Sequence, residues 1–491
     1  MEIFSQDSID VLFKNATIID GSNSPATVKD VAIIGNQIEL EPTLPVKDST
    51  RVIDAKGLIL APGFIDVHTH DDIEVIRNPE MLSKISQGVT SVIVGNCGIS
   101  ASPVKLNQPP PDPLNLLGEQ QDFKFTHFSD YVNAVTAARP AVNVAALVGH
   151  TALRLQVMDR LDRAASLLEI NTMRKALKLA LEQGAKGLSS GLAYSSASSA
   201  PGSELQSLAK EMKAFDAVYA THLRTEFDGI LDAMTEAFEL GSSANVSVVI
   251  SHLKCAGKLN WGRSSEILKH LKSAQKSQTV ACDCYPYSAS SSTLDLLQVT
   301  EDFEIFITWS EFYPQMAGKT LSHISQQWNI SLMDAAKKLQ PAGAVYHCMD
   351  DNDVENILQF SDSMIGSDGL PCDPHPHPRL WGTFPRVLGH YSRDKKLFKL
   401  EQAIHKMTGL SADKFKLNKR GYIRSGYYAD LVLFNPLTIK DRSDYVNPIA
   451  TAQGIEQVWV NGKLSYEPSN KFLIPAKAGL FLKHKEEIIN D

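Results

Sequence analysis

The sequence predicts an α/β fold, in which a (β/α)8 TIM barrel carries a small β-sandwich domain and an insertion between barrel strands 7 and 8. Three observations lead to this prediction. Apolar strand-like runs alternate with helical stretches through the middle of the chain, short strand-like runs gather near both termini, and one connection, residues 288–362, is far longer than a crossover helix needs.

Short strands with turn residues between them characterise both ends of the chain. They comprise Val11–Phe13, Thr17–Asp20, Val31–Ile34 and Val52–Asp54 at one end, and Ala429–Phe434 and Val458–Gly462 at the other. Because the two groups are alike, we expect one small β-domain, an antiparallel sheet built from residues 1–61 and 415–491.

The barrel is predicted for residues 62–414, where each apolar run is followed by a helical stretch. The eight runs are Gly63–His70, Thr90–Gly98, Val142–His150, Ala185–Leu192, Ala217–Leu223, Val246–Leu253, Thr279–Tyr287 and Ser363–Gly369. In such barrels the active site lies at the carboxyl ends of the strands, so the polar residues that end these runs are the candidates for function.

The insertion is predicted to cover about residues 293–352. It contains helix formers, as in Ser331–Leu339, and it leaves the barrel at the end of strand 7. Since that end carries the active site, we expect the insertion to form a lid or a wall of the substrate pocket.

Composition restricts the kind of partner. The chain has 491 residues, 43% of them hydrophobic, and a formal net charge of −8. An acidic chain offers no basic field for nucleic acid or an anionic membrane, so a small molecule is the expected partner, and the oligomeric state is left open. We see no signal peptide and no long apolar span, which predicts a cytoplasmic protein. The six cysteines do not form a disulfide framework.

The strongest local signal is Pro62–His70, an apolar strand that ends in His68-Thr69-His70. Residues i and i+2 of a strand point to the same face, so both imidazoles are expected to enter the barrel mouth together. Nitrogen ligands on one rigid element suit zinc. His222, His252 and Asp368 end three other strands, and the set predicts a metal centre at the barrel mouth.

This arrangement resembles the amidohydrolase superfamily, which uses His-x-His after the first strand, single histidines after the fifth and sixth, and aspartate after the eighth. Many members also use a carboxylated lysine from the fourth strand, but here Lys186 begins that strand, on the wrong side of the barrel. Cys97, in Gly95–Ser100 at the end of the second strand, offers a thiolate instead.

The segment Gly95–Ser100 is similar to a signature of the N-acyl-D-amino-acid deacylase branch. That resemblance implies one tightly bound Zn²⁺ on Cys97, His222 and His252. It also implies that His68, His70 and Asp368 frame a second, weaker metal position and the catalytic centre.

Candidate substrate-binding residues follow from the same resemblance and from the chemistry of an acylamino acid. Lys254 and Arg379 would supply cations for its α-carboxylate, and Tyr285 a hydroxyl donor. Tyr194 is a candidate donor to the oxyanion, Ser291 a candidate contact of the amino-acid side chain, and His150 a candidate pocket residue. His375 and His377 are interpreted as loop residues.

The predicted activity is zinc-dependent hydrolysis of N-acyl-D-amino acids with neutral or hydrophobic side chains, giving a carboxylate and the free D-amino acid. Asp368 would act as general base and then general acid. D stereochemistry is implied by the resemblance alone. Four alternatives stay open: a hydantoinase- or dihydroorotase-like cyclic-amide hydrolase, a deacylase of acidic N-acyl-D-amino acids, a deacylase of another acylated amine such as an acyl sugar, and an assembly protein without activity.

Overall fold

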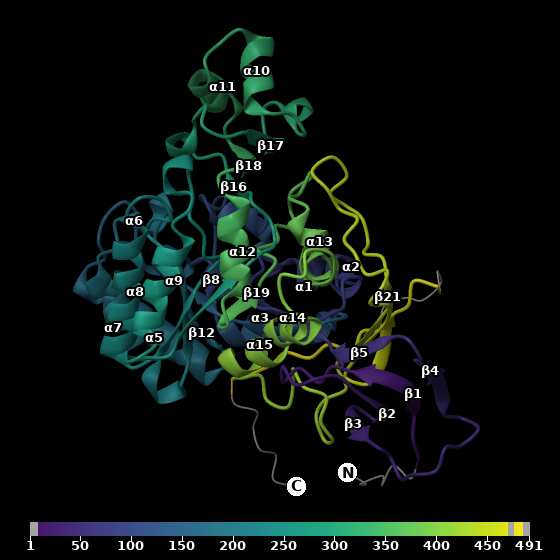
Figure 1. The fold of residues 1–491 in the computed structure, drawn as a ribbon. Helices are drawn as coiled ribbons and strands as arrows, with labels where there is room; N and C mark the ends of the chain where they lie inside the picture. Colours follow the sequence, from purple (N-terminus) through teal and green to yellow (C-terminus); the bar gives the residue numbers. More distant parts are fainter. Residues whose placement is uncertain (1–7, 470–475, 485–491) are drawn as a thin grey trace.

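Eight parallel strands form the barrel at the centre of the structure, a computed structural model that describes residues 8–469 and 476–484 (Figure 1). In chain order they are β6 (Phe64–Asp66), β7 (Val89–Val94), β10 (Asn143–Ala146) continued by β11 (Val148–Gly149), β12 (Gly187–Gly191), β13 (Val218–His222), β14 (Ser247–Ile250), β15 (Val280–Cys284) and β19 (Ser363–Ile365). A parallel bridge between Thr69 and Gly369 joins the ends of the first and last strands. The predicted barrel is confirmed.

Alternate residues of these strands fill the barrel. The interior cluster includes Val218 and Ala220 of β13 and Ala281 of β15, all buried. Because side chains repeat with a period of two in a strand, His222 and Asp283 continue the same inward rows at the carboxyl ends. The apolar plug therefore sits at the bottom of the barrel, and polar side chains take its place at the mouth.

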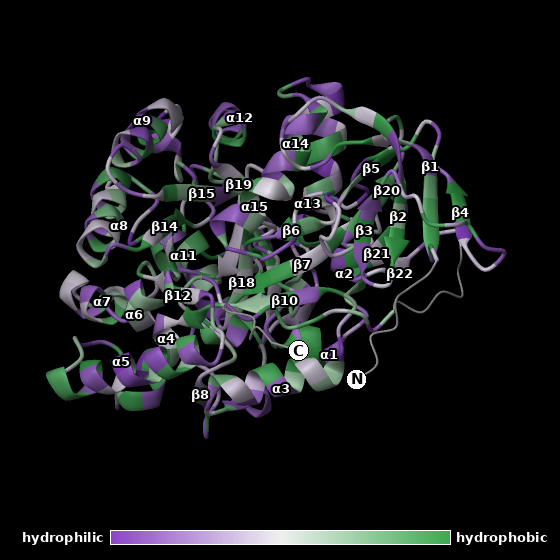
Figure 2. Ribbon diagram, turned by 90° about the horizontal axis from the view of Figure 1, so that it is seen from below, coloured by the Kyte–Doolittle hydropathy of each residue, from purple (hydrophilic) through white to green (hydrophobic). Residues whose placement is uncertain are grey.

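Helices cover the barrel because each buries one apolar stripe (Figure 2). In α8 (Ile230–Ala244), Met234, Ala237, Phe238 and Gly241 are buried, at the spacing of one helix face. The other long covering helices are α3 (Phe128–Ala138), α5 (Leu167–Glu182), α7 (Gly202–Ala209), α9 (Ser264–Ala274), α12 (Asp351–Gln359) and α14 (Leu400–Met407). None of the helices in the described ranges is long and apolar enough to cross a membrane.

The two ends of the chain share one sheet, as the sequence predicted. It contains β1 (Val11–Ile18), β2 (Thr27–Ile34), β3 (Gln37–Leu40), β4 (Arg51–Asp54), β5 (Ile59–Pro62), β20 (Leu431–Phe434), β21 (Ile455–Val460) and β22 (Lys463–Tyr466). Strands β5 and β20 pair antiparallel and so join the two ends. The sheet is mixed, however, because β1 runs parallel to both β4 and β5.

The last described residues, 476–484, return to the barrel, where Leu482 donates its backbone N–H to Val144 in β10. The predicted limits 1–61 and 415–491 remain a prediction, and residues 1–7, 470–475 and 485–491 lie outside the described part of the chain.

The insertion between β15 and β19 is a separate lobe at the top of Figure 1. Its core is an antiparallel sheet in the order β16 (Ser290–Thr293), β18 (Ala342–Tyr346), β17 (Ile305–Ser310). Helices α10 (Leu321–Trp328) and α11 (Leu332–Leu339) begin at Thr320 and Ser331, whose hydroxyls accept backbone hydrogen bonds. The helices follow from the sequence, whereas the sheet does not.

Candidate metal centre

Three residues at the barrel mouth have a left-handed backbone, Cys97 with φ 53°, His252 with φ 35° and Asp368 with φ 48°. They follow β7, β14 and β19. Residues with a Cβ seldom adopt this region, and such strain concentrates at functional sites. The strained positions coincide with three of the candidate ligands.

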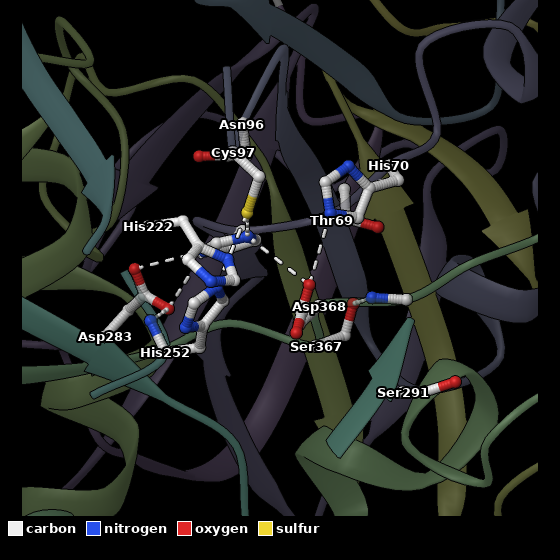
Figure 3. Close-up of polar contacts among 12 residues, drawn as sticks. Thr69, His70, Asn96, Cys97, His222, His252, Asp283, Ser291, Ser367 and Asp368 are labelled. Carbon is white, nitrogen blue, oxygen red and sulfur yellow. Dashed lines mark hydrogen bonds and ion pairs between the residues drawn. The ribbon is translucent and has the colours of Figure 1, made fainter. Parts of the chain in front are cut away.

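Four side chains converge at this point (Figure 3). Cys97 Sγ lies 3.2 Å from His68 Nε2 and 3.4 Å from His252 Nε2. Asp368 Oδ1 lies 3.4 Å from His68 Nε2 and 3.2 Å from His70 Nε2. One ligand atom each from His68, Cys97, His252 and Asp368 lies within 4.8 Å of the other three. We refer to these four residues as the four-residue cluster.

His222 lies beside the four-residue cluster. Its ring centroid is 4.5 Å from that of His252, and it makes a hydrogen bond with Cys97. The buried Nδ1 atoms of His222 and His70 have no hydrogen-bond partner among the described residues. Thiolate, imidazole and carboxylate donors are the ligands of zinc in proteins, so this donor set fits a metal ion.

The electrostatics single out Cys97 among the cysteines. Burial opposes its ionisation, but the charges of His68 and His252 and the hydrogen bonds from His222 and His252 outweigh burial and hold the pKa of the Cys97 thiol well below its ordinary value. Burial raises the pKa of the other five thiols, which are Cys255, Cys282, Cys284, Cys348 and Cys372. Only Cys97 is poised to bind as a thiolate.

Asp368 is held as a carboxylate. Its burial favours the neutral acid, but Arg379 and His68 prevail and keep the pKa of Asp368 well below its usual range. Arg379 Nη1 lies 2.8 Å from Asp368 Oδ2, and Nη2 donates to the backbone oxygen of Ser291 at 3.1 Å. The guanidinium carbon lies 4.6 Å from the centre of the Tyr285 ring.

A second group of polar atoms surrounds that ring. Lys254 Nζ lies 5.8 Å from the Tyr285 ring centre and 2.6 Å from a carboxylate oxygen of Glu226. Three buried atoms of this group, Tyr285 Oη, Ser291 Oγ and Arg379 Nε, have no hydrogen-bond partner among the described residues. Buried polar atoms are nearly always paired in folded proteins, so this Tyr285 group (Lys254, Tyr285, Ser291 and Arg379) has the character of a ligand site.

The remaining candidates lie apart from these two groups or at their edge. The Tyr194 ring centroid is 4.9 Å from that of His222, and Tyr194 hydrogen-bonds Ser292 of the insertion. His150 begins α4 (His150–Val157), and its Nε2 lies 2.9 Å from Glu204. His375 makes a hydrogen bond with the backbone oxygen of Tyr445, and His377 makes one with the backbone oxygen of Ala289. Such contacts are typical of residues that order a loop.

The His-x-His motif differs locally from the prediction. Strand β6 ends at Asp66. The side chains that point into the barrel here are Ile65, within the strand, and Val67, just after it. His68 and His70 therefore reach the site after the strand has ended, where only the Thr69 bridge remains. Lys186, in contrast, lies at the opposite end of the barrel, where its Nζ donates to the backbone oxygen of Lys416.

Three charged residues of the mouth were not found from the sequence. Glu226 contacts His252 Nδ1 at 2.8 Å, Asp283 contacts His68 Nδ1 at 3.2 Å, and Lys84 contacts Asp66 at 2.8 Å. A signal existed for the first two. Glu226 follows His222 by four residues, and Asp283 is a charged residue within the apolar strand Val280–Cys284.

Lys84 connects the first and last strand ends, so we expect Lys84→Met to destabilise the fold. Lys84 Nζ contacts Asp66, Asp71, Thr69 and Ser367 within 3.2 Å, and both Asp carboxylates are fully buried. Leaving buried carboxylates unpaired costs about 3–5 kcal/mol, measurable as a loss in the free energy of unfolding by denaturant titration. Lys29→Met, which removes only an exposed pair with Glu41, should cost at most about 1 kcal/mol. An equal loss in both variants would contradict this account.

Part of the stability of the fold is expected to depend on the negative charge of Glu204 and to be lost in acid. Burial favours its neutral form, but hydrogen bonds from His150 and Arg154 lower the pKa of Glu204 to about 2 from its ordinary 4.5. Its charge therefore stabilises the fold above pH 4.5, and this contribution is lost as the pH falls through the range down to about 2.

We expect Glu204→Gln to lower the melting temperature strongly at pH 7 and progressively less below pH 4.5. Glu182→Gln, at an exposed position of α5, is the matched control and should change little at either pH. A deficit of Glu204→Gln that is the same at pH 7 and pH 3 would refute the electrostatic origin.

Comparison with known proteins agrees with this geometry. Residues 51–466 match the Amidohydrolase family, and the chain belongs to that family. It is 45% identical to D-aminoacylase from Alcaligenes xylosoxydans xylosoxydans over 453 residues, which cover 92% of this chain and 93% of that protein. It is 46% identical to N-acyl-D-aspartate deacylase from the same organism, with 92% and 91% covered. The predicted family and its D-aminoacylase branch are confirmed.

Solved structures lead to the same branch. A structure of D-aminoacylase, described as having a binuclear metal centre with one-metal activation and second-metal attenuation, superposes with a TM-score of 0.93 at 45% identity and covers 97% of this chain and 100% of that chain. N-acyl-D-glutamate deacylase from Bordetella bronchiseptica, complexed with zinc and a phosphonate mimic of the tetrahedral intermediate, has a TM-score of 0.93 at 39% identity, with the same coverage. The chain is thus an amidohydrolase with a metal-binding site and the fold of this branch.

Proposed function

We propose that the protein hydrolyses N-acyl-D-amino acids to a carboxylate and the free D-amino acid, with zinc as its metal. The observation that carries this proposal is the juxtaposition of the four-residue cluster and the Tyr285 group, which share the Asp368–Arg379 ion pair. A metal centre next to unpaired cationic and hydroxyl donors suits a substrate that carries both an amide and a carboxylate. D stereochemistry rests on the similarity to D-aminoacylase.

Cys97, His222 and His252 are the proposed ligands of the tightly bound zinc, and His68, His70 and Asp368 frame a second, weaker position. The low pKa of the Cys97 thiol and the unpaired Nδ1 of His222 support the first set. The contacts of both His68 and His70 with one Asp368 oxygen support the second. When bound, zinc polarises a carbonyl and lowers the pKa of a bound water from about 15.7 to roughly 7.

Asp368 is the proposed proton carrier. It is the carboxylate of the four-residue cluster, and its Oδ1 already lies within 3.4 Å of two imidazoles. It accepts a proton from the attacking water and returns it to the amine nitrogen as the C–N bond breaks. Tyr194, beside His222, is the proposed donor to the carbonyl oxygen, while His150 keeps its proposed place in the pocket wall.

The α-carboxylate of the substrate is proposed to bind at the Tyr285 group. Lys254 and Arg379 both bring positive charge close to the Tyr285 ring. Tyr285 Oη and Arg379 Nε have no partner among the described residues and are free to donate a hydrogen bond. Hydrogen bonds from charged donors to a carboxylate are stronger than hydrogen bonds between neutral groups. The Ser291 hydroxyl is then available to the amino-acid side chain.

A neutral or hydrophobic side chain is the proposed preference, because Lys254 and Arg379 are assigned to the α-carboxylate and two further arginines near these strand ends are paired. Arg154 pairs with Glu204 and Arg224 with Glu236. An acidic side chain would need a further cation. The second candidate is a deacylase of acidic N-acyl-D-amino acids, because the similarity to the D-aspartate enzyme is equally high.

The experiment is to measure kcat/KM of zinc-loaded protein with N-acetyl-D-methionine, N-acetyl-L-methionine, N-acetyl-D-aspartate and N-acetyl-D-glutamate. We expect hydrolysis of the D-methionine derivative and a far lower value for the other three. A preference for D-aspartate or D-glutamate would replace the neutral substrate by the acidic one. Hydrolysis of dihydrouracil or hydantoin with no N-acyl-D-amino acid cleaved would overturn the proposal in favour of a cyclic amide.

A further inference from the structure

Asp283 is a buried carboxylate at the barrel mouth to which none of the proposed ligand or substrate roles applies. It lies near the end of β15, two residues after the interior residue Ala281, and only 2% of it is exposed. Figure 3 shows it next to His252, on the side of the four-residue cluster away from Asp368.

Its partners belong to two different strand ends. Asp283 Oδ1 lies 3.2 Å from His68 Nδ1 and accepts the backbone N–H of His252 at 2.9 Å. Within the described residues, no lysine or arginine forms an ion pair with it, and His68 is its one ionisable side-chain partner. A carboxylate without a cation is costly to bury unless it accepts hydrogen bonds, which here come from the His68 imidazole and the His252 backbone N–H.

The contact with the His252 backbone holds a strained residue. His252 has φ 35°, and its N–H is fixed by Asp283 Oδ1 while the next N–H, of Leu253, donates to the Asp283 backbone oxygen at 2.8 Å. Strained backbone persists only where its surroundings over-determine it. Asp283 supplies both of these acceptors.

The contact with His68 selects a tautomer. A carboxylate only accepts hydrogen bonds, so His68 Nδ1 carries a hydrogen toward Asp283, and Nε2, which faces Cys97 and Asp368, is the nitrogen that would give its lone pair to a bound metal ion. Gly366 packs closely against this pair, because a Cβ added there would lie 2.5 Å from His68 Cβ and 3.2 Å from Asp283 Oδ1. A lone pair directed at the cluster is what a metal ligand needs.

We propose that Asp283 is the positioning residue of the metal centre. It holds the His68 imidazole in the ligand tautomer and the His252 backbone in its strained conformation, so one carboxylate positions two residues of the four-residue cluster. The inference rests on the proposed metal centre and is independent of which amide is cleaved.

The test compares Asp283→Asn with Asp283→Ala. The asparagine oxygen still accepts the His252 N–H, so this variant should melt at the wild-type temperature. Its amide NH2 takes the place of Oδ2, which lies 3.4 Å from His68 Nδ1, and a donor there favours the tautomer with the hydrogen on Nε2, in which Nε2 has no lone pair for a metal. We expect cobalt(II) or zinc affinity to fall by about 10–100-fold at the position that uses His68, with an altered visible spectrum of the cobalt protein and a lower kcat at unchanged KM.

Asp283→Ala loses both contacts and should weaken the tightly bound metal as well. Cys282→Ala, one residue earlier and outside the interior row, is the control for damage to β15 and should keep the wild-type metal affinity. Wild-type cobalt spectra and affinities in both Asp283 variants would overturn the proposal, even if activity fell. Loss of metal affinity in Asp283→Asn, with no N-acyl-D-amino acid hydrolysed by the wild type, would sustain it and reject the proposed function.

Discussion

Asp368→Ala is expected to lower kcat for N-acetyl-D-methionine by about 10²–10⁴-fold while zinc remains bound. The variant loses the proton acceptor of the four-residue cluster but keeps Cys97, His222 and His252. It also leaves Arg379, which is buried, without its ion-pair partner. Steady-state kinetics and the zinc content of the same preparation measure the two effects separately.

The matched control is Asp362→Asn, which removes a carboxylate just before the same strand, β19, where it pairs with Lys414. This change lies at the far end of the strand, so kcat should stay near the wild-type value. Full activity of Asp368→Ala would remove Asp368 from the mechanism, and loss of zinc in that variant would make it a ligand of the tightly bound metal.

Cys97→Ala is expected to weaken the tightly bound zinc by at least about 100-fold, because even the loss of an outer partner of a ligand costs 10–100-fold. The Cys97 sulfur lies 3.2 Å from His68 Nε2 and 3.4 Å from His252 Nε2, at the centre of the proposed site. Without it, only His222 and His252 of the three proposed ligands remain to hold the ion. Competition with a chromophoric chelator measures the dissociation constant.

Cys282→Ala serves again as the control, because burial raises the pKa of the Cys282 thiol and keeps that thiol neutral. Its zinc affinity should equal that of the wild type. If Cys97→Ala retained zinc as tightly as Cys282→Ala, the tightly bound metal would have to rest on the histidines and Asp368, and the second position would become the principal one.

The fold was predictable because its signals are periodic. Alternating apolar rows such as Val218 and Ala220, followed by a polar residue at each strand end, predict both the barrel and the end at which the site lies. The β16–β18–β17 sheet of the insertion gave no comparable signal, since β16 is Ser290-Ser291-Ser292-Thr293, a run without an apolar side chain. Its pairing depends on contacts distant in sequence.

The site was predictable only for residues that end strands. His222, His252 and Asp368 were identified by that position, and the structure brings them to one point. Glu226 contacts His252 Nδ1, and Asp283 contacts His68 Nδ1. These contacts depend on the directions of side chains that come from different strands of the barrel. The positions of Glu226 and Asp283 mark them as unusual in the sequence, but a single sequence does not report which imidazole each of them contacts.

The lobe inserted after β15 has a consequence for how substrate preference changes over evolutionary time. Its first strand touches the site through the Ser291 backbone oxygen on Arg379 and through Ser292 on Tyr194, yet it contributes no residue to the four-residue cluster. Substitutions of Ser291 are therefore expected to change which amino-acid side chain is accepted, while a lineage keeps the residues of the metal centre unchanged.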